Sequence, residues 1–269
     1  MRSTEATNPV AIFDRVVCAI DGTPASIEAA RLLGRLMPAL GRVTLCSVVN
    51  PYTLVSEGGI FTERAVTQNA EEALQRAEAE LLPRLTPVAH LRRGTPVPEL
   101  LHELRQEHAT LLALGGHGHS RAAGIMTGSV ASGLLHQAPC PVLVARVPAR
   151  ADPPPDDVVV AFDGSAGAAR ALAVGRELAE RLLVGLRVVV ATGDRHRSEL
   201  ETVRDERGTQ LAGLTVTEDP RTAVEALLDA SASAGLIIIG SRRLQGLPSL
   251  GSVSERVAHR ALCSVLVMR

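Results

Sequence analysis

Short apolar runs alternate with longer amphipathic stretches along the whole chain. The runs are rich in Val, Ile and Leu, which is typical of strands buried on both faces, whereas the stretches between them repeat apolar residues at helical spacing. The pattern predicts strands at residues 15–20, 42–49, 88–91, 110–114, 141–144, 158–162, 187–191, 214–217 and 236–239. It predicts helices at residues 24–37, 62–85, 96–108, 130–137, 166–183, 198–211 and 222–233. Strands that alternate with helices in this way predict a parallel, doubly wound sheet.

The chain contains closely similar segments in its two halves. Residues 128–146 and 251–269 align without gaps, and ten of the 19 positions are identical. The Asp-Gly-Thr that follows the first predicted strand also returns, as Asp-Gly-Ser after the strand at 158–162. This duplication predicts two tandem doubly wound α/β domains. We expect them at residues 1–147 and 158–269, joined by a Pro-rich linker at 148–157 whose consecutive prolines favour a stiff spacer.

A series of glycines follows the buried strand at 110–114 and precedes the helix at 130–137, in the pattern Gly115-x2-Gly118-x9-Gly128-Ser129. Glycines allow backbone N–H groups to approach an anion closely, and the following helix would point its positive end to the same place. Ser129 can cap that helix or donate its hydroxyl to a phosphate. A plain crossover turn is the alternative, but the position outside the carboxyl end of a strand favours ligand binding.

An aspartate follows the first strand of each repeat, Asp21 in the first and Asp163 in the second. At that edge of a parallel sheet a carboxylate can accept hydrogen bonds from the hydroxyls of a ribose. An Asx-turn or a helix N-cap explains the same residue equally well. Sequence reasoning leaves both interpretations open.

The composition argues against several classes of protein function. Net charge is −1, Trp is absent and Tyr occurs once, which argues against nucleic-acid binding. All 28 basic residues are Arg, so a P-loop lysine and a lysine Schiff base are excluded. The N-terminus has no signal-peptide apolar region and no run is long enough to span a membrane, so we expect a cytoplasmic protein without membrane association.

Motifs for catalysis and metal binding are weak or missing. The sequence contains no GxSxG elbow and no HExxH, so no catalytic residue is assigned. His117 and His119 alternate within the glycine segment without a third ligand at useful spacing, which is weak support for a metal site. Four cysteines lie in or beside apolar runs without a CxxC pair, so we expect buried structural thiols.

Together these residues resemble the universal stress protein family. The resemblance rests on Asp21-Gly22-Thr23, Asp163-Gly164-Ser165, the glycine pattern of the first repeat and the segment Ala-Pro-Cys-Pro-Val-Leu-Val at 138–144, and it covers nearly the whole chain as two tandem copies. It implies a nucleotide-binding, Rossmann-like fold with five parallel strands in each domain. It also implies pairing through the last strands, either as a homodimer or as an intrachain pseudo-dimer.

The resemblance further implies that the glycine pattern binds ATP, as in the ATP-binding branch of the family. Asp21 would contact the ribose, and Ala19 and Val48 would flank the adenine. The ribose and phosphates would be held by Gly115, Gly118, Gly128, Ser129 and Val130. Mg²⁺ is compatible with a bound triphosphate, although no carboxylate cluster in the sequence demands it.

The second repeat departs from this pattern. It offers the corresponding residues Asp163, Gly240, Gly251, Ser252 and Val253, but Arg243 stands where Gly118 should recur and the loop is two residues shorter. If that position needs a left-handed backbone, Arg costs about 1–2 kcal/mol more than Gly. We therefore expect ATP in domain 1, weak or absent binding in domain 2, and a stress-response protein that acts as a nucleotide-responsive regulator. The alternatives are a structural interaction protein without nucleotide and a slow ATP-hydrolysing enzyme.

Overall fold

The computed structural model describes residues 12–38, 40–51, 55–56, 59–60, 63–81, 85–116, 129–148, 157–193, 210–241 and 253–269. The first repeat contains β1 (Arg15–Ala19), α1 (Pro24–Leu36), β2 (Arg42–Val49), β3 (Val55–Ser56), β4 (Gly59–Ile60), α2 (Glu63–Ala79), β5 (Val88–Arg93), α3 (Pro96–Gln106), β6 (Leu111–Gly115), α4 (Ser129–Gln137) and β7 (Val142–Ala145). The second contains β8 (Asp157–Ala161), α5 (Ala166–Leu182), β9 (Gly185–Ala191), β10 (Thr215–Asp219), α7 (Ala223–Ala230), β11 (Leu236–Gly240), α8 (Val253–Arg260) and β12 (Ser264–Met268).

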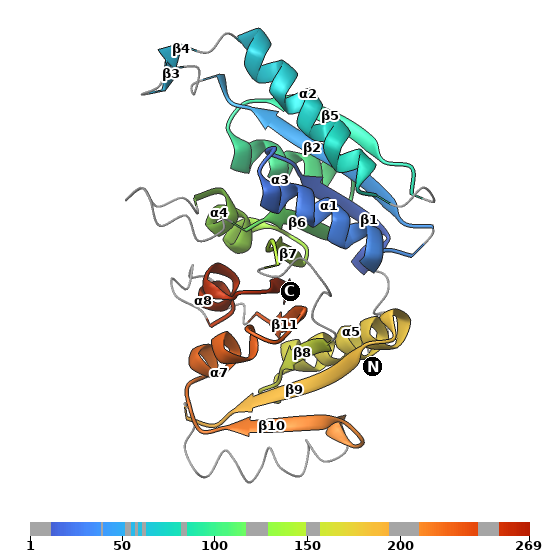
Figure 1. Ribbon diagram of the computed structural model, residues 1–269, viewed down its shortest axis with the longest axis vertical. Helices are drawn as coiled ribbons and strands as arrows, with labels where there is room; N and C mark the ends of the chain where they lie inside the picture. Colours follow the sequence, from blue (N-terminus) through green and yellow to red (C-terminus); the bar gives the residue numbers. More distant parts are fainter. Residues whose placement is uncertain are drawn as a thin grey trace, which may run out of the picture.

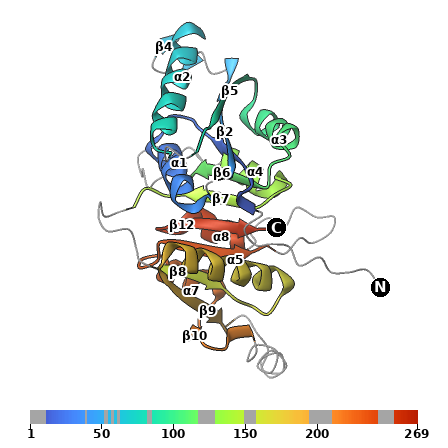
Figure 2. The same ribbon diagram turned by 90° about the vertical axis from the view of Figure 1, so that its right-hand side faces the viewer.

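The two repeats share one ten-stranded sheet with the order β10-β9-β8-β11-β12-β7-β6-β1-β2-β5. Within each repeat the strands pair in parallel, which confirms the predicted fold class. The repeats meet where β7 pairs antiparallel with β12 (Figure 2), and Leu143 lies opposite Leu266, the same position of the other repeat. Figure 1 shows the consequence, with the first repeat above this seam and the second below it.

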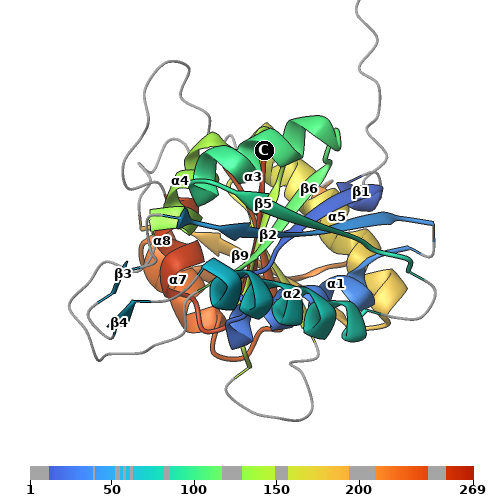
Figure 3. The same cartoon turned by 90° about the horizontal axis from the view of Figure 1, so that it is seen from above.

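Helices cover both faces of the sheet and form two apolar cores. One core lies under α1, α2 and α5, and the other lies under α3, α4, α7 and α8. Figure 3 shows α1 and α2 on one side of β2 and α3 on the other. Alternation along β1 serves both cores, because Val16 and Cys18 belong to the first and Val17 to the second.

Local chemistry starts the helices where the sequence predicts them. Thr23 caps α1 by accepting a hydrogen bond from the Ser26 amide, with Pro24 in the first turn. Thr222 and Glu225 form a reciprocal capping box at the start of α7. Each cap satisfies amide groups that the helix itself leaves without partners.

Several details differ from the sequence expectation. The helix expected at 62–85 ends at Ala79, shortly before Pro83, a residue that removes an amide donor and opposes helix in the residue before it. β3 and β4 pair between the strand predicted at 42–49 and the helix predicted at 62–85, where the sequence pattern predicts no strand. Most of the helix expected at 198–211, and residues 149–156 of the expected linker, lie outside the described residues.

All four cysteines are buried and none forms a disulfide. Burial raises the pKa of the Cys46 and Cys263 thiols to about 12 and that of Cys140 to about 11. The pKa of Cys18 is also raised, chiefly by its burial. Among the described helices, none combines the length and the apolar character needed to cross a membrane.

Candidate functional site

The candidate site lies at the carboxyl ends of β1, β2 and β6. From β1 the chain continues to β2 on one side, and β6 lies on the other side, so the order of the strands changes direction at this point. Such switch points leave a crevice at the carboxyl edge of open α/β sheets, where ligands bind. Three predicted residues are placed there by the strands themselves: Ala19 ends β1, Val48 is next to last in β2, and Gly115 ends β6.

Asp21 lies in a tight turn between β1 and α1 and is exposed. Its Oδ1 accepts hydrogen bonds from the Thr23 amide at 3.0 Å and from the Thr23 hydroxyl at 2.6 Å. Gly22 between them has φ of +80°, a left-handed conformation that favours glycine. Asp21 therefore forms the Asx-turn that the sequence left open, and its Oδ2 makes no hydrogen bond within the described part of the chain.

The second repeat builds the same turn. Oδ1 of Asp163 accepts from the Ser165 amide at 2.9 Å, and Gly164 again has φ of +80°. Ser165 then caps α5 by accepting from the Ala168 amide at 3.2 Å. Because both repeats share it, this turn belongs to the common architecture and does not distinguish one repeat from the other.

Gly115 has a packing role that sequence reasoning missed. A Cβ atom at this position would lie 2.5 Å from the Ser26 nitrogen and 2.7 Å from the Ala25 carbonyl carbon, both backbone atoms of α1. Gly240 is the counterpart, since its Cβ would lie 2.5 Å from the Gly167 carbonyl carbon and 2.8 Å from the Ala168 nitrogen. Each glycine therefore lets the first helix of its repeat begin directly against the strand end, which brings the amino terminus of that helix to the candidate site.

The start of α4 is the next described part of the chain after β6 and residue 116. Ser129 is the first residue of α4, and Val130 follows it as a half-buried side chain packed against the core under α3 and α4. In the second repeat Val253 begins α8 and is half-buried in the same way. The predicted residues between strand and helix lie outside the described residues: Gly118, Gly128, Gly251 and Ser252, together with His117, His119 and Arg243.

Ala19 and Val48 form an apolar, half-buried surface at the sheet edge, and both pack against the core under α3. The register reveals a difference between the repeats that the sequence alone did not. In the first repeat Ala19 lies opposite Cys46 of β2, and in the second repeat Ala161 lies opposite Val189 of β9. Two residues beyond these partners, β2 has Val48 and β9 has Ala191. The second repeat therefore offers a smaller apolar surface at this point.

The candidate site is connected to the seam between the repeats through Arg146, which is 6% exposed. Its Nη2 donates hydrogen bonds to the carbonyl oxygens of Ala258 and His259 at the end of α8, each at 2.7 Å. A Cβ on Gly116 would lie 2.7 Å from Nη1 of this guanidinium. Arg269 makes the reciprocal contact by donating to the carbonyl oxygen of Leu135 in α4. Burial lowers the pKa of Arg146.

Two side-chain contacts join α4 directly to α8. Oγ of Ser132 lies 2.8 Å from Nε2 of His259, and Nε2 of His136 lies 3.0 Å from a carboxylate oxygen of Glu255. Since α4 begins at the end of the glycine segment, the seam is in contact with the helix on which the candidate site depends.

Comparison with known sequences and structures gives a consistent result. The sequence model described as the Universal stress protein family matches residues 12–146 and 193–269. One universal stress protein of Mycobacterium tuberculosis is 31% identical over 291 residues, covering 94% of this chain and 96% of the relative. A second from the same organism is 30% identical over 226 residues, covering 74% of each chain.

Solved structures extend the similarity to the whole fold. The crystal structure of a universal stress protein from Archaeoglobus fulgidus aligns with a TM-score of 0.72 at 23% identity, covering 96% of this chain and 98% of that one. A crystal structure of a putative universal stress protein from Pseudomonas aeruginosa aligns with a TM-score of 0.67 at 18% identity, covering 97% and 95%. At these identities the structural similarity supports the fold alone.

Proposed function

Because the chain belongs to the universal stress protein family, we propose that it is a cytoplasmic, nucleotide-responsive regulator that binds ATP in its first repeat. One observation carries the proposal. At the carboxyl edge of β1, β2 and β6 an exposed carboxylate, a half-buried apolar surface and the amino termini of two helices converge. These three features match the ribose, the base and the phosphates of a nucleotide.

Each part of the nucleotide has a proposed partner. Oδ2 of Asp21 accepts from a ribose hydroxyl, because Oδ1 is already held by Thr23. Ala19 and Val48 lie along the adenine. The segment from Gly115 to Ser129, with Gly118 and Gly128, and Val130 after it, surrounds the phosphates with backbone donors and with the positive end of α4. Mg²⁺ would accompany the triphosphate and be held chiefly by its oxygens and by water.

We propose that the second repeat binds ATP weakly or not at all. Asp163, Gly240 and Val253 take positions like those of their counterparts, with Gly251 and Ser252 completing the set. Three differences from the first repeat argue against ATP binding: Arg243 in place of glycine, the shorter loop, and Ala191 in place of Val48. A smaller apolar contact and displaced amide donors both reduce affinity.

In this proposal the seam reports the nucleotide state. Binding of ATP orders the start of α4, and α4 contacts α8 through Ser132–His259 and His136–Glu255. The state of the first repeat is thereby transmitted to the second, where a partner protein reads it. Hydrogen exchange tests this step, because ATP should protect amides of α8 as well as those of α4. Protection confined to the first repeat would refute the transmission.

The binding proposal is tested with a matched pair of variants, Asp21→Asn and Asp163→Asn. Asparagine keeps an oxygen for the turn but replaces the second carboxylate oxygen with a donor. Loss of one hydrogen bond to a charged group corresponds to about 1.5–3 kcal/mol, or about 10- to 100-fold in affinity.

Calorimetry with ATP and the native mass of the purified protein provide the measurements. We expect one ATP per chain, the loss of affinity in Asp21→Asn and little change in Asp163→Asn. Two tightly bound ATP molecules per chain, no binding at all, or equal effects of the two variants would each contradict the assignment.

A further inference from the structure

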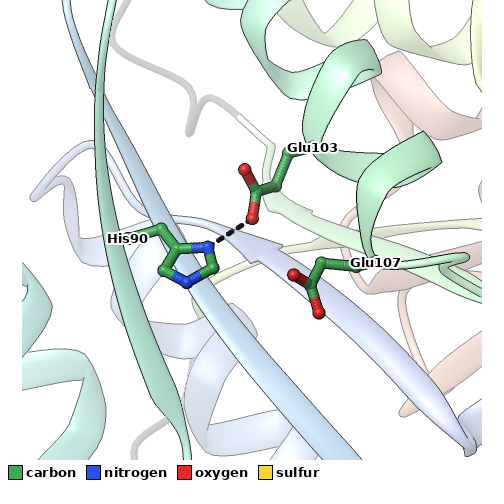
Figure 4. Close-up of side chains that lie close together, drawn as sticks. All are labelled: His90, Glu103 and Glu107. Atoms are coloured by element: carbon green, nitrogen blue, oxygen red, sulfur yellow. Dashed lines mark hydrogen bonds and ion pairs between the residues drawn. The ribbon is translucent and has the colours of Figure 1, made fainter.

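A second group of ligand-forming side chains lies away from the proposed nucleotide site, where α3 covers the edge strand β5. Figure 4 shows His90 of β5 facing Glu103 of α3 and Glu107, the residue that follows the last turn of α3. One ligand atom from each residue lies within 4.8 Å of the other two. Glu103 is 0% exposed although its neighbours on α3, Leu100 and Leu104, belong to the apolar core. A buried carboxylate in such a place requires partners of opposite charge.

Each member of the group is oriented by a specific contact. Nδ1 of His90 lies 2.5 Å from Oε1 of Glu103. Nε of Arg92 donates to the other oxygen of the same carboxylate at 2.6 Å. Oγ1 of Thr44 donates to Oε2 of Glu107 at 3.3 Å. Outer hydrogen bonds of this kind, here from Arg92 and Thr44, fix the carboxylates that ligate metals in proteins.

We propose that His90, Glu103 and Glu107 bind one divalent transition cation, with Zn²⁺ as the representative ion. The two carboxylates carry two negative charges and Arg92 supplies one positive charge, so the group can accept further positive charge. The cation binds between Nδ1 of His90 and Oε1 of Glu103 and replaces their direct contact, and a proton held on Nδ1 is released to solvent.

The donor set selects the class of cation. One imidazole nitrogen with two carboxylate oxygens suits Zn²⁺ and its neighbours, whereas Mg²⁺ and Ca²⁺ prefer oxygen ligands alone. Bonds of about 2.0–2.2 Å in a tetrahedral arrangement place ligand atoms roughly 3.3–3.6 Å apart. Side-chain rotation of the half-buried Glu107 brings its oxygen closer, and the 2.5 Å contact between His90 and Glu103 opens by about 1 Å to admit the ion. The His90 side chain is 32% exposed, which gives the ion an approach from solvent and leaves a fourth position for water.

The competing explanation is an ion network without metal that fastens β5 to α3. The two explanations differ in metal stoichiometry, which is measured by equilibrium dialysis of the full chain against Zn²⁺ after treatment with a chelator. The visible absorption of bound Co²⁺ provides a second measurement. Its bands become more intense when imidazole and carboxylate ligands hold the ion at a low coordination number. We expect one ion per chain, unaffected by a large excess of Mg²⁺.

Variants identify the ligands. His90→Gln should abolish binding, and Glu107→Gln, which leaves the buried Glu103–Arg92 pair intact, should weaken it at least tenfold. The matched control is His102→Gln, an exposed histidine on the same helix, which should bind as the unchanged protein does. Urea unfolding of each variant verifies that it is folded. If His90→Gln does not fold, Glu107→Gln still tests the proposal. A protein that binds no Zn²⁺, or one whose site survives in both ligand variants, would overturn the proposal.

Discussion

Gly115 and Gly240 allow stability and nucleotide binding to be separated in one experiment. Replacement of either by alanine adds a Cβ that approaches the backbone of the first helix of the same repeat to 2.5 Å. Backbone atoms cannot rotate away as a side chain can, so α1 in Gly115→Ala, and α5 in Gly240→Ala, must shift by about 1 Å to restore contact distances. Overpacking of this kind costs about 1–3 kcal/mol, and the stiffer unfolded chain of the alanine variants returns about 0.4–1 kcal/mol.

Both variants should therefore lose about 1–2 kcal/mol of unfolding free energy in urea titrations. Only Gly115→Ala should also weaken ATP binding, because the shifted α1 displaces the Asp21 turn that precedes it. Loss of one hydrogen bond to that carboxylate corresponds to about 10- to 100-fold in affinity by calorimetry. Gly167→Ala is the control for the substitution itself. Its Cβ meets nothing closer than 3.5 Å, so this variant should be at least as stable as the unchanged protein.

Two results would refute the reasoning. If Gly115→Ala is as stable as Gly167→Ala, the close approach of α1 to β6 does not require glycine. If Gly240→Ala weakens ATP binding as much as Gly115→Ala does, the nucleotide is not confined to the first repeat. The second result leaves the packing argument intact, so the two conclusions can fail independently.

Two further predictions concern the seam and the thiols. Arg146→Ala leaves the carbonyl oxygens of Ala258 and His259 without their donor in a buried seam, so it should lose about 2–4 kcal/mol in urea unfolding; a variant of unchanged stability would show that the guanidinium contributes nothing there. Burial raises the thiol pKa of Cys46 and Cys263 from 9.0 to about 12, so the thiolate fraction at pH 8 falls about 1,000-fold. A disulfide reagent should therefore modify the folded protein slowly, and the rate should rise with pH. In denaturant all four thiols should react together. Rapid modification of the native protein would contradict their burial.

The fold could be predicted from the sequence because local and global signals agree. Apolar runs alternate with amphipathic helices, and helix caps such as Thr23 and Thr222 stand where the pattern changes. The duplication then repeats the whole arrangement. The end of α2 was placed too late because the helical spacing of apolar residues continues toward Pro83, and only the structure shows that the helix has ended by Ala79.

The site was predicted in part. Sequence spacing places Asp21 and Gly115 at one edge of the sheet, but it cannot show that Gly115 lies against Ser26, because that contact joins positions far apart in the chain. The group around His90 was missed for the same reason. His90 and Glu103 are 13 residues apart on a strand and a helix, and their meeting depends on how α3 lies across β5. Contacts of this kind follow from tertiary packing, for which a single sequence carries no periodic signal.

The seam joins equivalent positions of the two repeats that now carry different side chains. Ser132 and Glu255 occupy the same position of the two repeats, as do His136 and His259, so Ser132–His259 and Glu255–His136 are one contact formed twice across a local two-fold axis. The repeats have since diverged, so one contact joins the imidazole to a hydroxyl and the other joins it to a carboxylate. Movement of α4 therefore changes two contacts of unequal chemistry, and movement of α8 changes the same two from the other side. In the proposed function, the first repeat, which alone has the full glycine pattern in its sequence, responds to the ligand, and the second repeat reports that response.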